Sequence, residues 1–167
     1  MLSSPKDGDG DMKKISDMLE KILKVASVCI LVLLVIVISI QIFARYVLNH
    51  SLSWSEELAR YLFIYLIFLG ASVVYKQDRH ISVDYFLDQL PARMKSIVGI
   101  SADILLLIFL VVVFYQGLRL SRLVYNVPTA ALYIPWTYVY LAIVIGSGSM
   151  VIFTLIFIYH RIRKESF

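Results

Sequence analysis

The sequence is poor in the residues that build disulfide, metal and haem sites. It has one cysteine, Cys29, and three histidines in 167 residues. A single thiol cannot form a disulfide framework, which excludes an enzyme that exchanges paired thiols. The histidines lie at or beyond the ends of the long apolar runs, so no pair of them can ligate a haem inside a bilayer; they are His50, His80 and His160. We therefore expect no cofactor and no metal site.

Charged residues are also scarce. They make up 17% of the chain, against 60% hydrophobic residues, and the mean hydropathy is +0.81. A soluble domain of this length has too little interior to bury so much apolar surface. The net charge of +4 comes from basic residues that flank the apolar runs, which points to membrane orientation and anionic lipid and not to nucleic acid. Because the sequence also lacks a glycine-rich phosphate loop, zinc-binding spacing and a nucleophilic constellation, we expect a membrane protein that is not an enzyme.

Four apolar runs are long enough to cross the hydrocarbon core, which needs about 20 helical residues. They predict spans at approximately 22–47, 54–75, 97–118 and 135–159, within a single integral membrane domain that covers residues 1–167. Ser53 as N-cap, with Glu56 three residues later, fits a capping box at the start of the second span. Pro135 suits the first turn of the fourth span. The predicted fold is an all-α membrane protein with four transmembrane helices.

Two further helices are predicted at the membrane surface. Before the first span, Ile15, Met18, Leu19 and Ile22 recur at helical spacing among charged residues, which predicts a short N-terminal amphipathic helix. Between spans two and three, at approximately 81–90, apolar residues follow an i, i+3, i+4, i+7 pattern that predicts an interfacial helix. These apolar residues are Val83, Phe86, Leu87 and Leu90.

Lysine and arginine are unevenly distributed between the two sides of the membrane. Twelve lie in the N-terminal segment, the middle connection and the C-terminal tail, and four lie in the other two connections. Positively charged segments stay in the cytoplasm. Both termini are therefore predicted to be cytoplasmic.

The most informative charges surround the short connection between spans one and two. Arg45 ends the first span, while Glu56, Glu57 and Arg60 open the second. Antiparallel helices joined this tightly place Arg45 within reach of Glu56 or Glu57, and Arg60 lies one turn beyond Glu56. Charges at this depth pair or reach toward water, and they often mark a functional face. Three interpretations stay open: a hairpin clasp with Trp54 as an interfacial anchor, contact with a partner, or a proton or ion relay.

Asp103 is an acid about two turns into the third span. An ionisable group in a span is a functional hypothesis by default, although pairing with Lys95 or reaching the interface would give Asp103 a purely structural role. The middles of the other three spans carry no acid that could couple a proton or sodium gradient.

Small residues in the spans predict places where helices approach closely. Gly70 lies in the second span, and Gly146-Ser147-Gly148-Ser149 forms a small-residue patch on the fourth. We predict that this patch is a packing face.

Several short segments, taken in order, point to a known family. They are Phe43-Ala44-Arg45-Tyr46, Trp54-Ser55-Glu56-Glu57-Leu58-Ala59-Arg60, Phe68-Leu69-Gly70-Ala71, His80-Ile81-Ser82-Val83-Asp84 with Leu90-Pro91, and Ala131-Leu132-Tyr133-Ile134-Pro135-Trp136. Their order, spacing and placement among four spans resemble the small membrane subunit of tripartite ATP-independent periplasmic (TRAP) transporters, the DctQ-like permeases. The chain departs from the family at Val144, where a proline often stands two residues before the glycine of the last span.

The resemblance implies a scaffold subunit of a sodium-coupled, binding-protein-dependent transporter in the bacterial inner membrane. The imported substrate would be an organic acid of the C4-dicarboxylate or sialic acid class. The partners would be a large elevator-type membrane subunit that carries the substrate and sodium sites, a periplasmic substrate-binding protein, and membrane lipids. The residues leave one alternative open, an autonomous small exporter that depends on Asp103 or Glu57.

Overall fold

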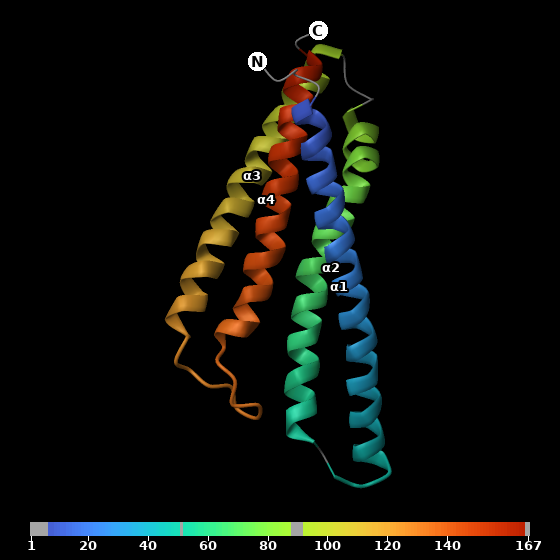
Figure 1. Ribbon diagram of the computed structural model, residues 1–167, viewed down its shortest axis with the longest axis vertical. Coiled ribbons are helices and arrows are strands. Elements are labelled where there is room, and N and C mark those ends of the chain that lie inside the picture. The colour runs from blue at the N-terminus through green and yellow to red at the C-terminus, as the bar shows by residue number, and fades with distance from the viewer. Residues whose placement is uncertain (1–6, 51, 88–91, 166–167) are drawn as a thin grey trace.

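The computed structural model describes residues 7–50, 52–87 and 92–165, with side chains for 14–50, 52–77 and 98–159. These residues form four helices (Figure 1), which are α1 (Asp7–Tyr46), α2 (Ser53–Leu87), α3 (Ala92–Leu123) and α4 (Thr137–Glu165). Each helix contains a stretch long and apolar enough to cross a membrane. These stretches are Lys14–Tyr46, Ser53–Gln77, Val98–Leu123 and Thr137–Tyr159. The prediction of an all-α protein with four membrane-crossing helices is confirmed.

The helices alternate in direction, so both ends of the described chain lie at the same end of the molecule (Figure 1). α1 packs against α2, α2 packs against α4, and α4 packs against α3. α2 and α4 therefore occupy the centre and run parallel, while α1 and α3 lie on the two flanks of this central pair. α1 with α2 and α3 with α4 form antiparallel hairpins, and the connections of both hairpins lie at the end of the molecule away from the termini, which we call the outer end (Figure 1).

α1 contacts its neighbour through one narrow seam. Buried and half-buried side chains recur along it every three or four residues, at Ser16, Glu20, Leu23, Ser27, Ile30, Leu34, Val37, Gln41 and Ala44. This is the spacing by which one helix keeps a single stripe against another in a coiled coil. Most of the remaining side chains of α1 are exposed, so its apolar surface is open to lipid or to a partner.

The central helices are joined by a close approach and by hydrogen bonds. A Cβ added at Gly146 of α4 would lie 2.7 Å from Cβ of Phe68 in α2. The Ser72 hydroxyl donates to the carbonyl oxygen of Gly146 at 2.9 Å, and the Tyr75 and Thr154 hydroxyls lie 2.7 Å apart. The predicted packing face at Gly146–Ser149 is confirmed.

Gly70 does not take part in such an approach. Nothing lies within 4 Å of a Cβ built on it. Among the described residues, the close contact expected at Gly70 is absent.

The two predicted surface helices are not separate elements. α1 is continuous from Asp7, so the predicted N-terminal helix and the first span form one helix. α2 likewise continues through Leu87, while Leu90 lies outside the described residues. The sequence between Gly70 and Pro91 contains no glycine or proline, so nothing in it interrupts the helical hydrogen bonds.

The boundaries of the last two spans also differ from the prediction. α3 continues past residue 118 to Leu123, and α4 begins at Thr137. Pro135 forms an isolated bridge with Pro128, and the Trp136 amide donates to the carbonyl oxygen of Val127 at 3.1 Å. Pro135 therefore belongs to a folded outer loop and not to the first turn of α4.

Candidate functional site

The outer hairpin between α1 and α2 is closed by an ion pair. Nη2 of Arg45 donates to Oε1 of Glu56 at 2.9 Å, which confirms that Arg45 reaches this part of α2. The two side chains are 54% and 41% exposed, so the pair contributes at most about 1 kcal/mol. Trp54, in the first turn of α2, is 41% exposed, and Arg60 is exposed and takes no part in the pair.

Glu57 faces another part of the molecule. Its carboxylate is buried and accepts hydrogen bonds from the loop between α3 and α4, from the amides of Ala131 at 2.5 Å and Leu132 at 3.0 Å. It also accepts a hydrogen bond from the hydroxyl of Tyr61. Glu57 was one of the two acids expected within reach of Arg45, and Glu56 is the one that pairs with it. The contacts of Glu57 join α2 to a loop more than 70 residues further along the chain.

The outer loop is shaped around this carboxylate. The Thr129 amide donates to the carbonyl oxygen of Ile134 at 2.8 Å, which closes the loop on itself. The Tyr61 ring meets the Trp136 ring edge to face, with centroids 5.7 Å apart. The amides of Ala131 and Leu132 are partly buried, and amides withdrawn from water need acceptors. Glu57 supplies that acceptor and thereby positions the loop.

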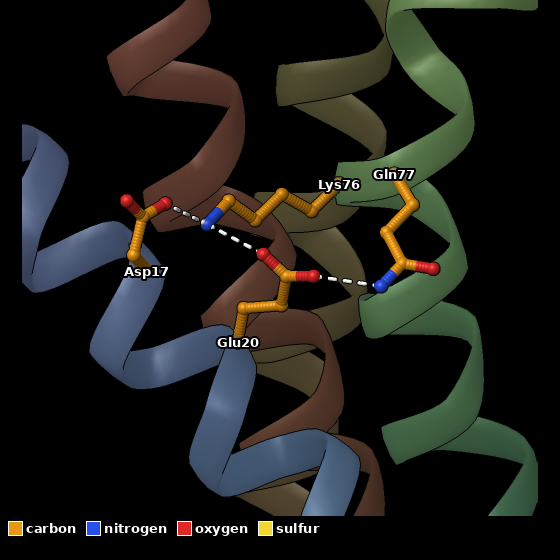
Figure 2. Close-up of polar contacts among 4 residues, drawn as sticks. All are labelled: Asp17, Glu20, Lys76 and Gln77. Carbon is orange, nitrogen blue, oxygen red and sulfur yellow. Dashed lines mark hydrogen bonds and ion pairs between the residues drawn. The ribbon is translucent and has the colours of Figure 1, made fainter.

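The opposite end of the α1–α2 pair carries a second polar cluster, which the sequence interpretation missed (Figure 2). Nζ of Lys76 in α2 lies 2.7 Å from Oδ1 of Asp17 and 2.7 Å from Oε2 of Glu20, both in α1. Nε2 of Gln77 donates to the other oxygen of Glu20 at 2.7 Å. The Lys76 ammonium also lies 5.6 Å from the centroid of the Phe153 ring, within the range of a cation–π contact.

The sequence held one signal for this cluster. Lys76 was counted as a loop cation, whereas the structure places it within α2 at the end of the apolar stretch, with its side chain only 12% exposed. Asp17 and Glu20 lie three residues apart, on one face of a helix that runs antiparallel to α2. Opposite charges at matching ends of adjacent spans could have indicated the pairing.

Replacing Lys76 with methionine is expected to destabilise the α1–α2 pair by about 1–3 kcal/mol, since removing one partner leaves half-buried Glu20 without its cation. This destabilisation is smaller than that expected for a fully buried ion pair because Asp17 is 59% exposed. Thermal unfolding in mild detergent measures the effect. Lys21→Met is the matched control, because Lys21 is exposed on α1. Equal unfolding temperatures for the two variants would contradict a stabilising role for the cluster.

Asp103 is buried in α3, with 4% exposure. The side chain of Lys95, its predicted partner, lies outside the described residues. That pairing therefore stays a prediction.

The interfacial side chains predicted at Val83, Phe86 and Leu87 also lie outside the part of the chain whose side chains are described. Their backbone is helical, as the end of α2. Their predicted contact with the membrane surface stays a prediction.

Taken together, the four apolar helices and the polar contacts that tie them describe a multi-pass membrane protein. Within the described residues, no group of three or more His, Cys, Asp or Glu side chains could hold a metal ion. The polar groups of Glu57 and Lys76 are used in contacts between helices and loops of the same chain.

The chain belongs to the DctQ family of TRAP transporter components. The family model described as "Tripartite ATP-independent periplasmic transporters, DctQ component" matches residues 34–164. The resemblance drawn from the sequence is confirmed, and the family is one of transporter components.

Three relatives illustrate the range of similarity. A Haemophilus influenzae protein provisionally named a TRAP transporter small permease protein is 33% identical over 153 residues, which is 92% of each chain. The sialic acid TRAP transporter small permease protein SiaQ of Vibrio cholerae is 31% identical over 59% of this chain and 57% of its own length. The isethionate TRAP transporter permease protein DctMQ of Oleidesulfovibrio alaskensis is 34% identical over 59% of this chain, a segment that makes up only 16% of that longer protein.

Proposed function

We propose that this chain is the small scaffold subunit of a sodium-coupled, binding-protein-dependent TRAP transporter, and that it braces a large elevator-type membrane subunit. One observation carries this proposal: the polar groups of Glu57 and Lys76 are used in contacts that stabilise the chain itself. In addition, the middles of α1, α2 and α4 carry no acid. A frame of this kind suits a scaffold. The substrate and sodium sites then belong to the partner.

The longer relatives support a membrane partner. In the isethionate DctMQ protein and in a Haemophilus influenzae sialic acid permease protein, SiaT, the segment that matches this chain is 16% and 13% of one permease chain. The remainder of such a chain would correspond to the large subunit that acts with this one. Both named substrates are organic acids, so we propose an organic acid substrate of the C4-dicarboxylate or sialic acid class, delivered by a periplasmic binding protein.

We further propose that the protein lies in the bacterial inner membrane with both termini in the cytoplasm. The excess of lysine and arginine in the terminal segments and the middle connection supports this orientation. The Arg45–Glu56 pair, Trp54 and the loop held by Glu57 would then lie on the periplasmic side, near the scaffold contact or the docking site of the binding protein. The amphipathic pattern of residues 81–90 would anchor the complex at the cytoplasmic surface.

The scaffold proposal predicts that the tagged chain, solubilised gently from its native membrane, brings down a large polytopic permease in a fixed stoichiometric ratio. Mass spectrometry of the purified sample identifies the partner. Recovery of this chain alone, as monomer or homo-oligomer, would overturn the proposal. Transport by the isolated chain in liposomes, lost on replacing Asp103 with asparagine, would establish the small-exporter alternative instead.

A further inference from the structure

The two central helices expose strips of different chemistry. Among the described side chains of α4, up to Tyr159, the exposed strip is apolar or aromatic and consists of Tyr138, Ile145, Ile152, Leu155 and Tyr159. Its two tyrosines are separated by about 31 Å of helix at 1.5 Å per residue, which is close to the thickness of the hydrocarbon core. Tyrosine at both boundaries with aliphatic side chains between them is typical of a surface that faces lipid.

The exposed strip of α2 has a different composition. Phe63, Ile67 and Val74 are 53%, 49% and 54% exposed, and Arg60 and Ala71 are exposed on the same side of the helix. Gly70 borders this strip, and a Cβ built there would meet no described atom of another helix within 4 Å. We call these six residues the α2 face.

Arg60 is the informative residue of the α2 face. It lies inside the apolar stretch Ser53–Gln77, one helical turn deeper than Glu56, and it forms no ion pair with a described residue. A cation at this depth is costly against lipid tails, so it either reaches toward the membrane surface or is paired inside a protein. The absence of bulk at Gly70 and Ala71, about three turns further along, suits a helix that approaches closely.

We infer that the α2 face packs against a transmembrane helix of the large permease subunit, which presents a carboxylate to Arg60 and approaches most closely at Gly70 and Ala71. This inference rests on the proposed scaffold function and adds the surface that carries it. The strip of α4 faces lipid. In the longer relatives the matching segment shares a chain with the rest of a permease, which provides a covalently linked membrane partner for such a face.

A second copy of this chain is a poorer occupant. Two copies in one membrane share the same orientation, so a symmetric dimer through the α2 face would bring the two Arg60 side chains to the same depth. Like charges facing each other oppose association. A partner that carries an acid at this depth removes the conflict.

Photocrosslinking in the intact transporter tests the location of the contact. We place benzoylphenylalanine at Ile67 on the α2 face and, as a matched control, at Ile152 on the strip of α4, because both are exposed isoleucines at 49% and 43%. The expected result is a crosslink to the large subunit from position 67 and none from position 152. A crosslink from 152 alone, from neither position in a complex that still co-purifies, or from 67 only to a second copy of this chain would overturn the inference and leave the scaffold function standing.

Substitutions test the chemistry of the contact, with the large subunit recovered per tagged chain as the readout. Arg60→Glu is expected to lower this recovery by at least about tenfold, and Arg60→Lys to keep most of it, because only the first reverses the charge facing the carboxylate. Gly70→Leu should lower recovery while leaving the membrane level of the tagged chain unchanged, since a Cβ at this position meets no described atom of another helix within 4 Å. Unchanged recovery for both Arg60→Glu and Gly70→Leu would refute the inference. If the wild-type chain itself recovered no large subunit, the scaffold function would fail with it.

Discussion

Replacing Gly146 with leucine is expected to prevent the chain from forming a stable fold. A Cβ at this position would lie 2.7 Å from Cβ of Phe68 and 2.8 Å from its carbonyl oxygen. Backbone atoms of α2 cannot move away without separating the two central helices. We expect a loss of about 3 kcal/mol or more, at the upper end of the usual cost of overpacking, together with loss of the Ser72 hydrogen bond to the Gly146 carbonyl. The fraction of protein that stays monodisperse in mild detergent after heating measures this loss.

Gly70→Leu is the matched control for this experiment. It introduces the same side chain into the other central helix, where a Cβ meets nothing within 4 Å, and it should leave the heat resistance of the chain unchanged or slightly raised, because leucine favours the helix more than glycine does. Equal losses for the two variants would show that the close approach of α2 and α4 is not what holds them together.

Replacing Glu57 with alanine is expected to release the outer loop between α3 and α4. The amides of Ala131 and Leu132 lose their shared acceptor, and the Tyr61 hydroxyl loses its partner as well. Buried donors without acceptors are unfavourable, so the loop should open more often. Hydrogen exchange at residues 131 and 132, followed by mass spectrometry, should become at least about tenfold faster.

Glu56→Ala serves as the control because it removes a neighbouring carboxylate of the same size. The Arg45–Glu56 pair is largely exposed, so its loss should cost at most about 1 kcal/mol and leave exchange in the outer loop unchanged. Unchanged exchange in the Glu57 variant, or equal acceleration in both variants, would show that the carboxylate of Glu57 does not hold the loop.

The sequence was sufficient for features that depend on local pattern. Four apolar runs predict four membrane-crossing helices because the hydrocarbon thickness sets the minimum length of such a run. The contact between Arg45 and Glu56 could be predicted because a short connection leaves the two helix ends little freedom. The small residues at Gly146–Ser149 indicate a packing face, since backbone contact between helices requires them.

Features that depend on the relative positions of distant segments could not be predicted in the same way. The partners of Glu57 lie in a loop 74 and 75 residues away, and the partner of Lys76 at Asp17 is 59 residues away. No periodicity fixes which residues of two helices stand opposite each other over such separations. Gly70 shows the converse, because a small residue predicts a close approach but does not tell whether the neighbour belongs to the same chain.

The order in which the helices pack has a consequence for how the protein is made. α1 with α2 and α3 with α4 are neighbours in sequence, so each pair can form as soon as its second helix has left the ribosome and entered the membrane. The contact between α2 and α4 must wait until the last helix is inserted, since Gly146 and Thr154 are part of it. A newly made chain should therefore pass through a stage with two formed hairpins that are not yet joined. Defects at Gly146 would hold the protein at that stage, inserted in the membrane but exposed to quality control.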